Sequence, residues 1–293
     1  MRSLLLVSAA LLASCAAQAA EPPAFRLCTG SEAGHYFRAG HLLKSKASSV
    51  QLEVIPTQGS LDNLDKIVAG QCDGAFVQAD ALLVYSARNA QALSTLERAG
   101  VLYQEQAHLL CNRQAGIKRV VDLTKATTVA VGPDGSGGRT TWDAFVLADK
   151  TRYAPIQIDT RSGVRALSAV ADGSQVQCML WVGALNASFI KGDAQAQGDR
   201  IVLAGTDDRD MTTTAKDARG QPVYTYGEIP AGTYPRIQPA GLVYGTKALG
   251  TIAVDALFVT GLAWVTAHER AYDGLLRAFA AAKPQIQSLV QPQ

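Results

Sequence analysis

The first third of the chain alternates between short apolar runs and segments with helical spacing. Apolar or alternating runs predict strands over residues 24–29, 50–56 and 74–78. Each run is followed by a turn and then by a helical segment, over 36–47, over 61–69 and from Asp80 onward. Because strand, loop and helix repeat in this order, we expect a parallel sheet with helices on its faces.

The same order begins again after a long apolar strand predicted over 101–112. Further strands are expected over 129–131, 155–158, 175–182 and 201–204, with helices over 140–148 and 163–171. The polar segment 206–226 is interpreted as a loop, 252–260 as a strand, and 264–290 as a helix broken at Pro284. Two α/β units joined by crossing strands predict a ligand cleft between them, at the carboxyl ends of the strands.

A glycine-rich loop over 132–138 follows one of these strands and precedes a helix. Its four glycines let successive backbone N–H groups point inward, and the helix start adds partial positive charge. The spacing excludes a nucleotide P-loop, since Arg139 stands at the lysine position and Pro133 at the first glycine. We therefore expect either a site for a carboxylate or other small anion, with Ser136 and Arg139 as side-chain partners, or a plain strand-to-helix turn.

The amino terminus is typical of an exported protein. Arg2 precedes an apolar run over 4–13, and small residues lead to an A-x-A site that ends at Ala19, so residues 1–19 are predicted to be a signal peptide. The segment ending at Cys15 resembles a lipobox, which makes lipid anchoring the alternative. The whole chain has 48% hydrophobic residues, a net charge of +2 and no basic cluster, which is ample for a core and argues against nucleic-acid partners. We also expect the exported protein to be a periplasmic monomer.

Six short motifs stand in a fixed order along the rest of the chain. Together they resemble the TAXI family of periplasmic solute-binding proteins, which serve TRAP transporters, and the resemblance extends over essentially the whole chain after the signal peptide. The motifs are Thr29 to Tyr36, Thr57 to Leu64, Phe76 to Asp80, Ala115 to Leu123, Val131 to Gly137, and Ile229 to Tyr234.

The resemblance implies an α/β, two-lobed periplasmic-binding-protein fold (type II-like), in which each lobe is a mainly parallel sheet flanked by helices. Lobe I is expected over 21–106 and 246–293, and lobe II over 107–245. The implied function is capture of a small carboxylate or amino-acid-like (glutamate-like) solute by cleft closure, and delivery to a TRAP-type cation-coupled permease. The alternative is a periplasmic ligand-sensing input protein for a membrane sensor.

Ligand contacts carried over from the resemblance come from the turn after the first strand, from the next two loops and from the glycine-rich loop. Arg139 and Trp181 are added from their positions near the cleft, although Trp181 could equally pack in the core. Glu32 departs from the family pattern, and it either faces solvent or meets a cationic group of the solute. The predicted site is Gly30, Ser31, Glu32, Gly34, His35, Tyr36, Ser60, Asn63, Gln78, Asp80, Gly135, Ser136, Gly137, Arg139 and Trp181.

No enzymatic constellation is recognisable. The four histidines lack metal-binding H-x-x-x-H spacing, and no G-x-S-x-G nucleophile motif occurs. We therefore expect neither catalysis nor a metal or cofactor.

The cysteines permit one geometric hypothesis. If 107–113 pairs antiparallel with 175–182 so that His108 lies opposite Trp181, the same register places Cys111 opposite Cys178, where a disulfide can form. Cys28 and Cys72 are expected at different heights of parallel strands and therefore unpaired.

Overall fold

One mixed sheet runs through the part of the chain that the structure describes. The structure is a computed structural model that describes residues 21–217 and 220–291, so the predicted signal peptide and Cys15 lie outside the described residues. The strands are β1 (Ala24–Cys28), β2 (Gln51–Ile55), β3 (Gly74–Gln78), β4 (Leu96–Asn112), β5 (Thr128–Ala130), β6 (Gln157–Asp159), β7 (Cys178–Gly183), β8 (Ile201–Ala204), β9 (Tyr224–Ile229) and β10 (Leu249–Gly261).

Helices cover this sheet and connect its strands. They are α1 (His35–Lys44), α2 (Ser60–Val68), α3 (Ala79–Arg88), α4 (Gly137–Ala148), α5 (Lys150–Tyr153), α6 (Gly163–Asp172), α7 (Arg209–Thr214), α8 (Leu262–Ala267) and α9 (Glu269–Ser288). Short 3-10 turns lie at Ala90–Thr95, Arg113–Ala115 and Val120–Asp122, and a π turn lies at Phe189–Ala194.

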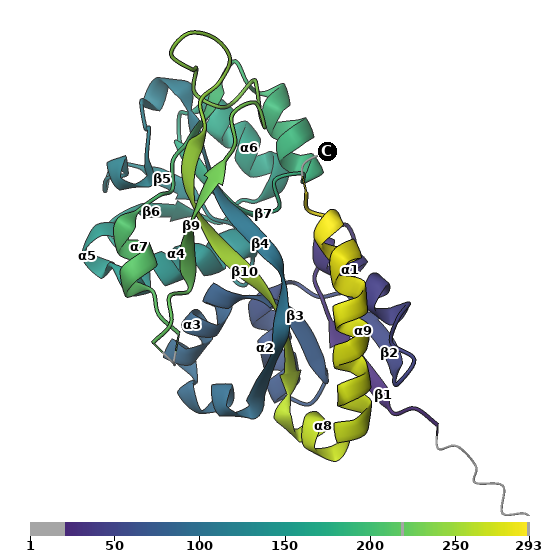
Figure 1. Cartoon of the computed structure of the whole chain (residues 1–293). Helices are drawn as coiled ribbons and strands as arrows, with labels where there is room; N and C mark the ends of the chain where they lie inside the picture. The colour runs from purple at the N-terminus through teal and green to yellow at the C-terminus, as the bar shows by residue number, and fades with distance from the viewer. Residues whose placement is uncertain (1–20, 218–219, 292–293) are drawn as a thin grey trace, which may run out of the picture.

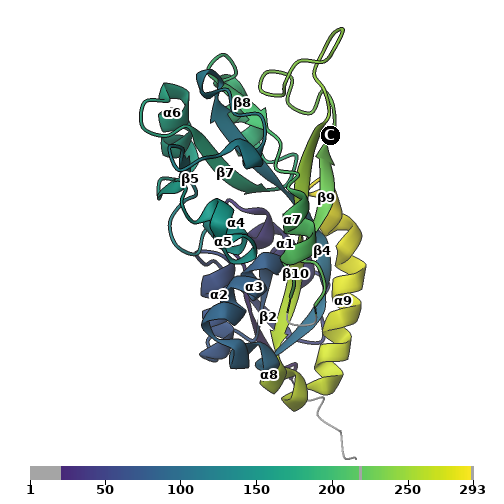
Figure 2. The same cartoon turned by 90° about the vertical axis from the view of Figure 1, so that its left-hand side faces the viewer.

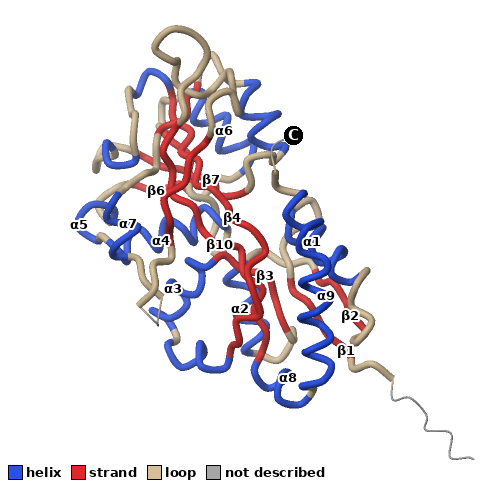
Figure 3. The backbone as a smooth tube through the Cα atoms, viewed as in Figure 1, coloured by secondary structure: helices blue, strands red, loops and turns tan. Residues whose placement is uncertain are grey.

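Two long antiparallel strands join the halves of the sheet. The strand order is β2-β1-β3-β10-β4-β7-β5-β6, with β8 also paired to β4 and β9 to β10. Pairing is parallel between β1 and both β2 and β3, and between β5 and both β6 and β7. Figures 1 and 3 show β4 and β10 crossing the middle of the molecule between these halves, and Figure 2 gives the view turned by 90°. The α/β fold expected from the sequence is confirmed.

We call β1–β3 with α1–α3 and α9 the first lobe, and β5–β8 with α4–α6 the second lobe. The predicted division at residues 106 and 107 falls inside β4, which pairs with the other crossing strand, β10, and with β7 of the second lobe. These boundaries stay a prediction. In the described residues, no helix combines the length and apolar character that crossing a membrane requires.

Helix α9 corrects one sequence expectation. Pro284 does not break it, and the interruption lies instead at His268, between α8 and α9. The buried residues of α9 recur at helical spacing on one face, and Ala282 and Ile286 on either side of the proline are fully buried. Packing of this face against α1 and β4 therefore outweighs the hydrogen bond that the proline removes.

Segment 206–226, expected to be a loop, contains α7 and the start of β9. Asp208 caps α7, since its Oδ1 accepts a hydrogen bond from the N–H of Asp210 at 3.0 Å. The run of acidic residues that suggested a loop is thus in part a helix start.

The cysteines form two disulfides. Strand β4 pairs antiparallel with β7 in the predicted register, with His108 opposite Trp181, and Cys111 is bonded to Cys178 with a Cα–Cα distance of 4.0 Å. The expectation that Cys28 and Cys72 are unpaired is wrong, because these residues are bonded with their Cα atoms 6.0 Å apart. Cys72 precedes the paired residues of β3, in the turn after α2, where its N–H donates to the carbonyl of Lys66. The strand register, which pairs Cys28 with Ala75, therefore does not fix its position.

Candidate functional site

Four helix N-termini border one cavity of about 230 Å³. Helices α1, α2 and α4 present their first residues His35, Ser60 and Gly137, and α3 presents its N-cap Gln78. The first N–H groups of a helix have no partner within the helix, and they carry partial positive charge that favours anions. The lining residues are Gly30, Ser31, Gly34, His35, Tyr36, Gly59, Ser60, Gln78, Glu105, Gly137, Trp181, Val182 and Gly183.

The glycine-rich loop borders a second, adjoining cavity of about 190 Å³ that shares Gly137, Trp181 and Val182 with the first. Ser136 lies here as the N-cap of α4, where its Oγ accepts from the N–H of Arg139 at 3.4 Å and donates to the carbonyl of Val131 at 3.3 Å. The Ser136 hydroxyl therefore fixes the conformation of the loop, and the N-terminus of α4, which begins at Gly137, lines the cavity.

Glu105 is the ionisable residue of the cavity that the sequence reasoning missed. It lies on β4 with 8% of its surface exposed, and its Oε2 accepts a hydrogen bond from the Tyr36 hydroxyl at 3.3 Å. Burial, and secondarily the nearby Asp80, raise the pKa of Glu105 from 4.5 to about 8. A charged residue in the middle of a long, mostly buried strand was the available sequence signal.

Gln78 offers a free hydrogen-bond donor to the same cavity. Its backbone N–H donates to Ser60 Oγ at 3.0 Å, which fixes the start of α3 beside the start of α2. Its side-chain Nε2 is buried and has no partner within the protein. A buried amide without a partner is costly, and a bound solute is a natural acceptor for it.

Trp181 is held at the cavity by aromatic neighbours. Its ring lies 5.1 Å from the ring of His108 and 5.8 Å from that of Phe189. Burial lowers the pKa of His108 to about 4, so this imidazole is neutral at pH 7, and its Nε2 lies 3.0 Å from the Tyr234 hydroxyl. Tyr234 of the motif at 229–234 thus contacts His108, and His108 in turn packs against Trp181 of the cavity wall.

Two predicted site residues brace the protein and do not line either cavity. Asn63 is fully buried, and its Nδ2 donates to the carbonyls of Thr29 and Phe76 at 2.6 and 2.7 Å. Asp80 is also fully buried, and its Oδ2 accepts from Thr141 Oγ1 at 2.6 Å and from the Tyr224 hydroxyl at 2.8 Å. Asn63 therefore ties the loop after β1 to strand β3, and Asp80 ties the first lobe to the second.

Three further predicted residues lie outside both cavities. Arg139 is engaged by carboxylates of its own chain, since its Nη1 lies 2.6 Å from Asp134 and its Nε lies 2.9 Å from Asp143. Glu32 is exposed and does not line the cavities. Gly135 meets the first lobe instead, because a Cβ atom on Gly59 would lie 2.8 Å from its carbonyl oxygen.

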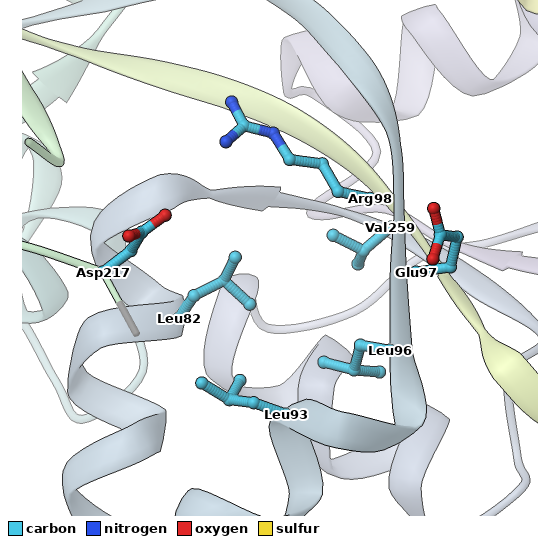
Figure 4. A pocket seen from close by; sticks show the side chains of 7 residues that line it. All are labelled: Leu82, Leu93, Leu96, Glu97, Arg98, Asp217 and Val259. Atoms are coloured by element: carbon cyan, nitrogen blue, oxygen red, sulfur yellow. The ribbon is translucent and has the colours of Figure 1, made fainter. Parts of the chain in front are cut away.

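Another pocket, of about 130 Å³, has a different character (Figure 4). No residue of the predicted site lines it. Leucine and valine side chains form most of its wall, and the lining residues are Leu82, Leu93, Leu96, Glu97, Arg98, Asp217 and Val259. Among the residues described, no cluster of three or more histidine, cysteine or acidic side chains has the arrangement of a metal site.

Solved structures of similar fold include periplasmic binding proteins. The periplasmic aliphatic sulphonate binding protein SsuA from Escherichia coli matches with a TM-score of 0.54 and 16% identity, over 92% of this chain and 75% of that one. The periplasmic nitrate-binding protein NrtA from Synechocystis PCC 6803 matches with a TM-score of 0.52 and 12% identity, over 89% of this chain and 61% of that one. At such identities the likeness concerns the fold alone.

Sequence comparison gives the family. The model of the NMT1-like family matches residues 27–263, which include every element from the end of β1 to the start of α8. The chain therefore belongs to the NMT1-like family and has the fold of the periplasmic solute-binding proteins.

Proposed function

We propose that this protein is a periplasmic receptor that captures a small amino-acid-like carboxylate and delivers it to a TRAP-type, cation-coupled membrane permease. The observation that carries the proposal is the pairing of four helix N-termini with one buried acid, Glu105, around a single cavity. Helix N-termini suit a carboxylate, and a buried carboxyl group suits an ammonium group. A zwitterionic solute satisfies both.

The cationic end of the solute is assigned to Glu105 and not to Glu32. Glu105 lines the cavity and is buried, whereas Glu32 is exposed and outside it. In the empty cavity Glu105 is largely protonated at pH 7, since its pKa is raised to about 8. An ammonium group beside it lowers that pKa, and binding then releases a proton.

Closure of the two lobes completes the site. Gly137 of the second lobe lines the cavity opposite residues of the first, and a Cβ atom there would lie 2.6 Å from Gln78 Oε1. A solute that contacts both lobes stabilises the closed form over the open one. The TRAP assignment rests on the resemblance of the six motifs to the TAXI family.

A thermal-shift panel of L-glutamate, other amino acids, glutarate, ethanesulfonate and nitrate tests the solute class, because a ligand that binds only the folded state raises its melting temperature. We expect the largest shift from an amino acid. A shift from ethanesulfonate or nitrate alone would contradict the proposal. Uptake that collapses with the ion gradient, and not with ATP depletion, is the result expected of a TRAP partner.

A further inference from the structure

Residues 242–244 form an apolar tip that stands clear of the protein surface. Leu242, Val243 and Tyr244 are 107%, 87% and 89% exposed, whereas the other exposed large apolar side chains in the described residues reach at most 58%. Single exposed apolar residues need no explanation, but three consecutive ones indicate a contact surface. They lie in the connection between β9 and β10, which rises at the top of Figure 1.

A paired backbone presents the 242–244 tip. The N–H of Gly241 donates to the carbonyl of Gly245 at 2.9 Å, and the N–H of Lys247 donates to the carbonyl of Pro239 at 3.0 Å. Ala240 and Thr246 form a bridge between these bonds. The tip is therefore the end of a hairpin with its own hydrogen bonds.

The motif at 229–234 braces this hairpin. Gln238 is 3% exposed, and its Nε2 donates to the carbonyls of Pro230 and Lys247 at 3.0 and 3.1 Å. Its Oε1 accepts from the N–H of Tyr234 at 2.8 Å. None of these residues lines the solute cavities, so the motif holds the hairpin in place without serving as a solute contact.

The chemistry of the tip selects among partners. Residues 237–246 carry no charge, and only Arg236 and Lys247 flank them. Attachment of a protein segment to lipid grows with its buried apolar area and with basic residues that attract anionic lipids, and the tip supplies three apolar side chains flanked by only two basic ones. A stable self-dimer buries roughly 800 Å² on each partner, far more than three side chains provide. A neutral, apolar tip that contains leucine and tyrosine suits a concave, apolar pocket on a partner protein that binds this chain transiently.

We infer that the 242–244 tip inserts into an apolar pocket on the external face of the membrane permease that receives the solute. This inference rests on the receptor function proposed above. Docking through the tip leaves the solute cavities free, because the two surfaces share no residue. The tip therefore contributes to permease affinity and not to solute affinity.

Photo-crosslinking tests the inference. The purified chain carries p-benzoylphenylalanine in place of Val243, or in place of Val164, a valine of α6 that is 57% exposed. Each protein is irradiated with right-side-out inner-membrane vesicles from the source cells, which expose the external face of the permease, and adducts are identified by mass spectrometry. We expect a permease subunit as the Val243 adduct, at least tenfold above Val164. Excess wild-type protein removes this adduct, and excess L242S/Y244S does not.

Several results would overturn the inference: equal labelling at the two positions, an adduct with a second copy of this chain, an adduct with lipid, or equal competition by L242S/Y244S. Calorimetry on L242S/Y244S separates the two proposals. If L242S/Y244S binds solute as tightly as wild type and the chain labelled at position 243 gives no permease adduct, only the docking role is removed. A permease adduct from a protein that binds no solute supports the docking surface and removes only the receptor function.

Discussion

Asp80 Oδ2 accepts a hydrogen bond from Thr141 Oγ1 at 2.6 Å, and this buried contact joins α3 of the first lobe to α4 of the second. Burial raises the pKa of Asp80 to about 6, so the carboxyl is ionised at pH 8. The contact is a charge-assisted bond between the lobes, next to the cavity that both lobes line.

Replacing Thr141 by valine removes this donor without changing the shape of the side chain. We expect Thr141→Val to lower the free energy of unfolding by about 1.5–3 kcal/mol at pH 8, because the lost bond is to a charged acceptor. The neighbouring Thr140 is the matched control, since its buried Oγ1 has no partner. If urea unfolding shows that Thr141→Val and Thr140→Val lower the free energy of unfolding equally, the inter-lobe hydrogen bond does not contribute to stability.

Glu105 makes stability depend on pH in the neutral range. The unfolded chain loses this proton near pH 4.5 and the folded protein near pH 8, so the folded state holds more protons between these values and its stability falls as pH rises. His108 and Asp80 change the stability mainly below pH 6.5, since their pKa values in the folded protein are about 4 and about 6. We therefore expect a fall of up to about 1.4 kcal/mol per pH unit between pH 6.5 and 8.

The variant Glu105→Gln should abolish this fall, measured by urea unfolding at several pH values. Glu97 lies on the same strand but is exposed, and Glu97→Gln should keep the wild-type dependence. The same pH dependence in wild type and Glu105→Gln would show that Glu105 is not the group responsible.

The two disulfides should each stabilise the protein. Cys28–Cys72 and Cys111–Cys178 close segments with sequence separations of 44 and 67 residues. By the loop-entropy relation, each contributes about 4 kcal/mol. We expect the double variant C111A/C178A to lose about this much by urea unfolding. Mass spectrometry after alkylation without reductant should find none of the four cysteines modified, and four alkylated cysteines in the exported protein would contradict the pairing.

Gly137 should matter more for solute binding than Arg139. A Cβ atom at Gly137 would lie 2.6 Å from Gln78 Oε1, inside the cavity, so Gly137→Ala should weaken solute affinity at least tenfold. Arg139 is held by Asp134 and Asp143, and Arg139→Gln should leave affinity within about twofold. Calorimetry with the best solute of the thermal-shift panel measures the affinity of both variants. A larger loss of affinity in Arg139→Gln than in Gly137→Ala would show that Arg139 contacts the solute.

The sequence predicted the fold well where a local pattern carries the information. Strand β3 has the predicted bounds, because a short apolar run between turns leaves little choice. The β4–β7 register followed from pairing His108 with Trp181, and it placed Cys111 and Cys178 correctly. The Cys28–Cys72 bond was missed because it depends on how the chain enters β3, which no periodicity encodes.

The site was harder to predict, because the order of strands and helices gives the position of a loop but not the direction in which its side chains point. Helix N-termini follow from strand-loop-helix order, so Gly34, Ser60 and Gly137 were found at the cavity. Arg139 was expected to contact a solute beside the glycine-rich loop, but its side chain forms an ion pair with Asp143 one turn along the same helix. Glu105 escaped notice because its strand crosses between the lobes, and only the assembled fold brings it to Tyr36.

Proton release on binding measures whether the cavity holds a zwitterion between helix N-termini and Glu105. At pH 7, calorimetry of L-glutamate, or of the best amino acid in the panel, is compared in phosphate and Tris buffers. We predict release of close to one proton, loss of that release in Glu105→Gln, and at least tenfold weaker binding of glutarate, which lacks the ammonium group. Glutarate that binds as tightly as glutamate, with no proton exchanged and no effect of Glu105→Gln, would contradict the account.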